Sequence, residues 1–457
     1  GSASDVDAMT IASNGQVTFS QTLIGTALDI SGDIDVDGTT NLDVVDIDGA
    51  VDMATTLTLA GNADFNGDLD VDGTTNLDVV DIDGAVDMAS TLQVDGAITG
   101  SSTINGVGIS SDITNFSESM LISNDAGTGT LSSATNNTGF GYEVFDDLTS
   151  GVSNTAFGRK ALTVNTTGGS NTAIGMNALL ANTTASNNTA VGKSALTANT
   201  TGANNAAVGK DALSANTTGA SNVAIGRGAM QTNTTASNNT AVGDEALYAN
   251  TTGTQNVAVG HSSLQQNTTA DNNTAVGNLA LYANTTGANN VAVGSSSLDA
   301  NTTGSANTAV GSNSLSAITT GDSCSAFGYY ALQNATGVGN TAMGRDALVA
   351  CTTGNLNVAI GAYALDANTV GDRNIAVGFG ALGTYNPASN EDAYNVAVGH
   401  SALLDTTTGT KNTAIGGLAM ESNTTGVDNT SVGYGALYAN TTASYNTAVG
   451  KSALGVN

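Results

Sequence analysis

The chain has few of the residues that build a compact globular core. Its 457 residues include no tryptophan, one proline and two cysteines, and aromatic residues make up 4% of the total. Two cysteines are too few for a disulfide framework, and they lack the spacing of a zinc site, so we interpret Cys324 and Cys351 as structural thiols. The apolar residues are mainly Val, Ile, Leu and Ala at regular intervals, which favours a thin core extended along an axis.

Positive charge is also scarce. Nine Lys and Arg residues stand against 39 Asp and Glu, the net charge is -30, and the first basic residue is Arg159. Such a chain repels a phosphate backbone, so we expect no nucleic-acid partner. There is neither a basic amphipathic stretch nor an apolar run of membrane-spanning length, so we expect no membrane insertion. The first residues also lack the pattern of a secretory signal.

Most of the chain is a 17-residue repeat. The stretch NTAVGKSALTANTTGAN, residues 188–204, is followed and preceded by close copies of itself, and alignment on the Gly of A-V-G gives 19 units from Gly141 to Gly450. One unit, ending at Gly344, is shortened, and an insertion lengthens the unit that ends at Gly399.

Two columns of this alignment are apolar: the residue before the Gly and the fourth residue after it. With so much Gly, Asn and Thr, helix propensity is poor. We therefore predict one strand at T-A-V-G, a second at x-A-L-x-A and a turn at N-T-T-G. The predicted fold is all-β, an elongated β-solenoid or β-roll of 17-residue coils. At ~4.8 Å per coil, the 19 units would form a rod of about 90 Å.

An asparagine stands four residues before the Gly in nearly every unit. Stacked amides can hydrogen-bond along the axis, which predicts a structural ladder; a ligand-binding row is the alternative. Cys324 occupies this column, and Cys351 occupies the column of Asn165, Asn182 and Asn199, which supports packing roles for both thiols. The position after the Gly holds many of the basic residues and both histidines, so we expect it to face water.

The N-terminal part carries a different, acidic repeat. Residues 35–54 recur unchanged at 70–89, an offset of 35 residues. Asp alternates with Ile and Val, which predicts strands with an acidic outer face. The D-x-D-x-D-G spacing resembles the opening of a calcium loop, but Val44 and Val79 stand where that loop needs a bidentate Glu. Calcium is the cofactor that this spacing suggests, and a solvated acidic strand is the alternative. The candidate ligands are Asp33, Asp35, Asp37, Asp68, Asp70 and Asp72.

These patterns divide the chain into four parts. Residues 1–30 form a lead-in, 31–96 the acidic 35-residue β repeats, 97–136 a transition segment rich in Ser, Thr, Asn and Gly, and 137–457 the 17-residue repeat solenoid.

The motif N-T-A-V-G-x-x-A-L resembles the head repeats of trimeric autotransporter adhesins, whose coils are shorter. The longer form, N-T-A-V-G-x-x-A-L-x-x-N-T-T-G, and the acidic units are similar to sequences in bacteriophage tail fibres, including those of marine cyanophages. This resemblance covers nearly the whole chain and implies an intertwined homotrimeric fibre. Closure around a threefold axis would also protect open strand edges from aggregation.

The resemblance implies a structural and adhesive fibre of a phage virion, located in the extracellular virion tail. It would assemble with other tail proteins and present a surface to a host glycan or protein. The alternatives are a bacterial trimeric adhesin at the cell surface, a polysaccharide-cleaving tailspike and an ice-binding solenoid. Most units contain no acidic residue, and an inverting or retaining glycosidase needs two carboxylates, so we expect no enzyme.

The insertion before Gly399 is the candidate receptor contact. It contains the single proline of the chain, flanked by two tyrosines, and a loop that leaves the coil and exposes aromatic rings is suited to a glycan or protein. A tolerated surface insertion is the alternative. The candidate residues are Tyr385, Asn386, Pro387 and Tyr394.

Overall fold

The computed structural model describes residues 9–19, 50–51, 53, 56, 58–60, 62–63, 103–104, 107–113, 116–123 and 131–456. The chain divides into two units, residues 1–93 and 94–457. In the described part of the first unit, β1 (Met9–Ile11) pairs antiparallel with β2 (Val17–Phe19), with Met9 opposite Phe19. Most of the acidic repeats, including all six candidate calcium ligands, lie outside the described residues.

The second unit begins with three antiparallel strands: β3 (Thr103–Ile104), β4 (Val107–Ile113) and β5 (Phe116–Ser123). Strand β5 then pairs in parallel with β6 (Thr138–Phe140), the strand of the first coil. Phe116 and Leu121 of β5 are buried in the same core as the coils. Part of the predicted transition segment therefore continues the sheet of the solenoid.

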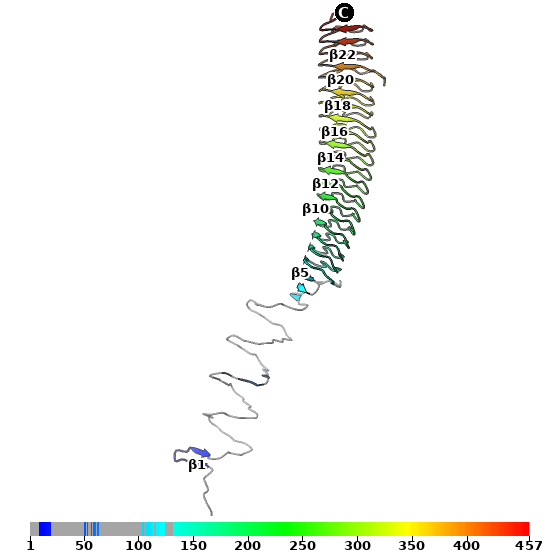
Figure 1. Cartoon of the computed structure of the whole chain (residues 1–457). Coiled ribbons are helices and arrows are strands. Elements are labelled where there is room, and N and C mark those ends of the chain that lie inside the picture. The colour runs from blue at the N-terminus through cyan, green and yellow to red at the C-terminus, as the bar shows by residue number, and fades with distance from the viewer. Residues whose placement is uncertain are drawn as a thin grey trace, which may run out of the picture. The chain divides into compact units, whose positions relative to one another are not determined.

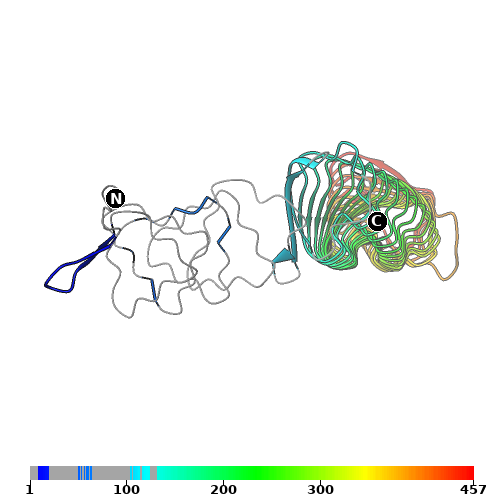
Figure 2. The same cartoon turned by 90° about the horizontal axis from the view of Figure 1, so that it is seen from below.

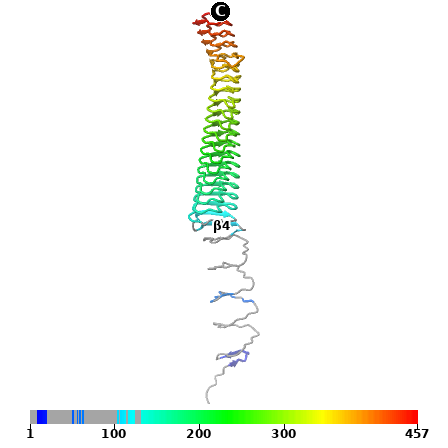
Figure 3. The same cartoon turned by 90° about the vertical axis from the view of Figure 1, so that its right-hand side faces the viewer.

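From β6 onward the chain forms a parallel β-solenoid with one three-residue strand per coil (Figures 1 and 3). Each strand pairs in register with the strand of the next coil, as Ala207 with Ala224, and the described residues contain no helix. The predicted all-β solenoid of 17-residue coils is confirmed. The remaining strands are β7 (Thr155–Phe157), β8 (Thr172–Ile174), β9 (Thr189–Val191), β10 (Ala206–Val208), β11 (Val223–Ile225), β12 (Thr240–Val242), β13 (Val257–Val259), β14 (Thr274–Val276), β15 (Val291–Val293), β16 (Thr308–Val310), β17 (Ser325–Phe327), β18 (Thr341–Met343), β19 (Val358–Ile360), β20 (Ile375–Val377), β21 (Val396–Val398), β22 (Thr413–Ile415), β23 (Thr430–Val432) and β24 (Thr447–Val449).

The second predicted strand, at x-A-L-x-A, is wrong. This segment forms turns, and its leucine has a left-handed backbone, with φ of 51° at Leu196 and 50° at Leu213. A left-handed conformation costs an L-residue about 1–2 kcal/mol. Full burial of a leucine side chain contributes about 1.5–3 kcal/mol, and both leucines are 0% exposed. The fold therefore accepts the strained backbone because it places the leucine in the core.

The core of each coil is thin. In the coil around Gly192 it consists of Ala190 at the centre of the strand, then Ala195 and Leu196 in the turns, all of them 0% exposed. Because neighbouring residues of a strand point to opposite faces, Thr189 and Val191 point away from this core. One of the two apolar columns thus fills the coil, and the other faces outward.

Two asparagine ladders run through the interior. In the first, the backbone N–H of Asn205 donates to Oδ1 of Asn188 at 2.9 Å, and its side-chain amide donates to the carbonyl of Gly219 at 2.9 Å. In the second, Nδ2 of Asn199 donates to Oδ1 of Asn182 at 3.0 Å and to its own turn at the carbonyl of Gly202 at 2.9 Å. These bonds confirm the structural ladder predicted for the column four before the Gly.

The ladders are interrupted where hydrophobic residues and the thiols replace asparagine. Ile318 takes the place of the next amide above Asn301, whose buried Oδ1 has no hydrogen-bond partner in the described residues. Cys324 and Cys351 are buried, and their thiols donate to the carbonyls of Gly337 and Gly354 at 3.4 and 3.5 Å. Burial raises the pKa of both thiols, to about 12 for Cys351, so both remain protonated and packed at neutral pH.

Replacing a central ladder amide should destabilise the solenoid more than an outer substitution. Asn233 donates to Oδ1 of Asn216 at 2.8 Å and accepts from Nδ2 of Asn250 at 3.0 Å. Asn233→Ala would leave the buried Oδ1 of Asn216 without a partner and would remove one of the two hydrogen bonds of the Asn250 amide, which keeps its bond to the carbonyl of Gly253. Each unpaired buried group costs about 1–3 kcal/mol, so we expect a loss of about 3 kcal/mol in denaturant unfolding. Thr235→Ala, on the exposed side of the same turn, is the control. Equal unfolding midpoints for the two variants would contradict the structural role of the ladder.

Candidate functional site

The first candidate surface is the outer face of the parallel sheet, which we call the sheet face. It consists of the first and third residues of strands β6 to β24, which point away from the core. None of these residues is charged. Several large apolar side chains on it are exposed by more than a third, namely Phe140, Phe157, Ile174, Val208, Ile225, Val276, Phe327, Met343, Ile360, Ile375, Ile415 and Val449.

The sheet face is large for an exposed surface. With ~4.8 Å between strands and about 7 Å between its two columns, 19 strands make a surface of about 600 Å². This area equals the upper end of the range for the largest apolar patches of monomeric proteins, but only the column of third strand residues is apolar throughout, because the first strand residue is Thr in most coils. Neighbouring coils align their side chains on it: the rings of Phe140 and Phe157 stack at 5.0 Å with an interplanar angle of 11°.

Positive charge lies beside the sheet face, at the residue after the glycine. As predicted, this column faces water, and the basic residues and histidines in it are all exposed: Arg159, Lys193, Lys210, Arg227, His261, Arg345, His400 and Lys451. The uncharged face is therefore bordered along one side by a column in which six of the 19 residues are Lys or Arg, some of them paired with carboxylates, as Arg227 is with Asp244.

The second candidate surface is the insertion between β20 and β21, where a loop leaves the outline of the coil (Figure 2, orange). Tyr385 and Pro387 are buried, so the expectation that the insertion exposes both tyrosines is wrong for Tyr385. Tyr385 is the seventh residue after Gly378 and therefore stands in the second asparagine ladder, inside the coil. Its hydroxyl donates to Oε1 of Glu391 at 3.2 Å, and burial together with Glu391 raises the pKa of Tyr385.

The other two candidate residues are exposed. Asn386 accepts a hydrogen bond from the hydroxyl of Thr369 at 2.6 Å, as part of the turn. Tyr394 is 51% exposed, its hydroxyl donates to Oδ2 of Asp392 at 3.4 Å, and the guanidinium of Arg373 lies 5.8 Å from its ring centre. Arg373 also forms an ion pair with Asp392. Asp392 and Arg373 thus contact the Tyr394 side chain, and half of its surface remains exposed to solvent.

Tyr394 belongs to an outward row that the sequence reasoning missed. The column five before the glycine is left-handed throughout, and in most earlier coils it holds Ser or Asn, which tolerate that backbone. In the last coils bulky or charged residues replace them, at a steric cost of about 1–2 kcal/mol for each residue other than Asp, which tolerates this backbone as Asn does. The row, which we call the C-terminal ridge, comprises Leu356, Arg373, Tyr394, Lys411, Asp428 and Tyr445.

Two pairs of adjacent acids could be proposed for polysaccharide cleavage, and both are engaged in other contacts: Glu391 accepts from the Tyr385 hydroxyl, and Asp392 pairs with Arg373. Asp244 and Glu245 both pair with Arg227, at 2.8 and 3.1 Å. Within the described ranges no group of three His, Cys, Asp or Glu side chains could hold a metal ion. The same residues contain no helix long and apolar enough to cross a membrane.

The fold and its surfaces define a class of protein: a parallel β-solenoid with one strand per coil, an uncharged sheet face, and the C-terminal ridge, which includes two exposed tyrosines. The chain matches none of the protein-family models and none of the curated proteins with which it was compared.

Proposed function

We propose that this protein is a structural and adhesive fibre of a phage virion, in which three copies associate through their sheet faces. The observation that carries the proposal is the uncharged, partly apolar surface along all 19 coils of a chain with a net charge of -30. Its area of about 600 Å² approaches the ~800 Å² per partner of a standard stable interface. Association would remove this surface from water and leave the cations at its border solvated.

Repetition provides length in this proposal. Each coil contacts only its neighbours, so additional coils extend the rod by ~4.8 Å each without a new folding problem. The adhesive part rests on the C-terminal ridge, where exposed Tyr394 and Tyr445 break the column pattern. The contact partner would be a glycan or protein of the host cell surface. Tyr394→Ala tests that contact, because it should reduce adsorption to host cells and leave the fold intact. Tyr385→Ala is not a suitable test, because it removes a buried core side chain.

The first test is the solution mass of the full chain by light scattering. We expect about 135 kDa, three times the chain mass of 44.9 kDa. A mass near 45 kDa would overturn the trimeric fibre, and a monomer that also lowers the freezing point by thermal hysteresis would point to an ice-binding solenoid. Antibody labelling then separates the virion from the bacterial surface: label on phage tails supports the proposal, and label only on cells supports the adhesin.

A further inference from the structure

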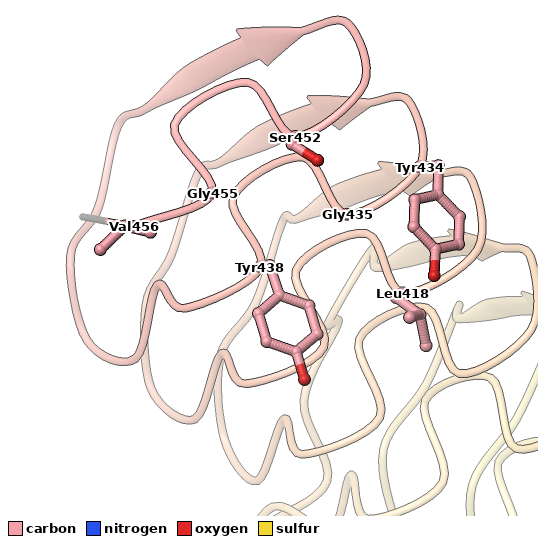
Figure 4. Close-up of a pocket in the computed structure, with 7 residues that line it drawn as sticks. All are labelled: Leu418, Tyr434, Gly435, Tyr438, Ser452, Gly455 and Val456. Carbon is pink, nitrogen blue, oxygen red and sulfur yellow. The ribbon is translucent and has the colours of Figure 1, made fainter.

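A recess opens between two tyrosines of one coil, outside the C-terminal ridge. One of them, Tyr434, follows Gly433 and so stands in the column that borders the sheet face. Tyr434 and Tyr438 form its walls, 56% and 42% exposed, and Leu418 and Gly435 lie between them (Figure 4). Ser452, Gly455 and Val456 of the following turns complete the lining. Its volume of about 400 Å³ lies within the range of small-molecule sites.

The walls of the recess are held in place by the coil below. The Tyr434 ring lies against Gly417, where a Cβ would be 3.5 Å from the ring. The Tyr438 hydroxyl donates a hydrogen bond to the carboxylate of Glu421, which raises the pKa of Tyr438 above its ordinary value. The buried Oε2 of Glu421 has no hydrogen-bond partner in the described part of the chain. The recess thus joins two aromatic faces with the hydroxyl groups of the tyrosines and of Ser452, while Glu421 supports one wall from outside the lining.

We propose that this recess binds a neutral saccharide, one pyranose ring lying between Tyr434 and Tyr438. The C–H faces of a pyranose are apolar and fit aromatic walls, while its hydroxyl groups can bond to Ser452 and the tyrosine hydroxyls. None of the seven lining residues carries a charge, and the chain has a net charge of -30, so a neutral sugar fits better than an acidic one. The inference rests on the proposed adhesive function and names a ligand class for it.

Gly435 keeps the recess open. A Cβ on Gly435 would meet only Oγ of Ser452, at 3.9 Å, within 4 Å. Gly435 has φ of 59°, and the same column of the repeat holds leucine at Leu279 and Leu418 with φ of 55° and 58°. A leucine is therefore compatible with this backbone, and at position 435 it would fill the space between the tyrosines.

The test is saturation-transfer NMR on the full chain with the methyl glycosides of glucose, galactose, mannose and N-acetylglucosamine, and with glucuronic acid as the anionic probe. We expect transfer to at least one neutral glycoside and none to glucuronic acid. Gly435→Leu, and separately Tyr434→Ala with Tyr438→Ala, should weaken binding at least tenfold. Absence of transfer to every neutral probe, or a preference for glucuronic acid, would overturn the proposal.

Matched variants separate loss of the site from loss of the fold. Gly380→Leu makes the same change in the same column, at φ of 60°, and Tyr329→Ala with Tyr282→Ala removes tyrosines from the two equivalent columns of other coils. These variants should bind like the wild type; if they lose binding equally, the saccharide does not occupy this recess. A trimeric fibre that adsorbs to cells but binds none of the sugars would refute this inference and leave the proposed function standing.

Discussion

Gly260→Ala should unfold the solenoid far more easily than Gly253→Ala, although the chemical change is the same and the positions are seven residues apart. Gly260 has φ of 131°, a region that L-residues rarely adopt. An added Cβ would lie 2.4 Å from the carbonyl oxygen of Gly277 and 2.6 Å from its carbon. Both atoms are backbone, so no flexible side chain can move aside. We expect a loss of at least about 4 kcal/mol, the range of severe single substitutions.

The loss should also change the form of the transition. In a solenoid each coil is stabilised by its two neighbours, so a break at one coil uncouples the parts on either side. Denaturant unfolding followed by circular dichroism should therefore show two transitions for Gly260→Ala and one for the wild type.

Gly253→Ala is the control because its column accepts alanine. A Cβ at Gly253 would lie 2.3 Å from the carbonyl of Ala270, which looks equally unfavourable. The same column, however, holds Ala236 and Ala270 in neighbouring coils, and Gly253 has no positive φ. We expect a change within about 0.5 kcal/mol, the usual range for a tolerated substitution. If both variants unfold like the wild type, the close approach of the coils does not require glycine at position 260.

The sequence was sufficient to predict the repeat, the solenoid and the first asparagine ladder, because all three follow from spacing. The turn at A-L was not predictable from propensity. Leucine in a left-handed conformation is unfavourable by itself, and only burial in the finished coil compensates for it, as at Leu196. The compensation is a tertiary effect, and the propensities of neighbouring residues in the sequence do not include it.

The insertion shows a second reason why a prediction from sequence was wrong. Tyr385 was predicted to be exposed because it lies near the only proline, yet counting seven residues from Gly378 places it in the ladder of Asn165 and Asn182. Its position in the repeat was a better guide than its neighbours. The same counting would have found the C-terminal ridge, since Leu356 and Tyr445 stand where earlier coils have Ser or Asn. The recess could not be predicted, because it depends on how far the rings of Tyr434 and Tyr438 lie apart.

Charge on the sheet face should dissociate the proposed fibre. Ile225 and Val276 are 43% and 36% exposed in the single chain, so Ile225→Glu with Val276→Glu should leave the coil folded. In an assembly around a threefold axis, each substitution would place three like charges against one another in an apolar interface, at several kcal/mol. We expect the mass in light scattering to fall from about 135 kDa to that of one chain, 44.9 kDa. This corresponds to a dissociation constant raised at least a thousandfold, or about 4 kcal/mol.

The control introduces the same charges outside the sheet face. Thr235→Glu with Thr286→Glu has the same separation of three coils and lies in the exposed outer turns. Its mass should remain that of the wild type, because surface charges away from an interface are solvated in both states. Circular dichroism of both variants shows whether the coils are intact. If the sheet-face variant keeps the mass of three chains, the copies associate through another surface; if both variants dissociate, added negative charge acts through general repulsion in an already acidic protein.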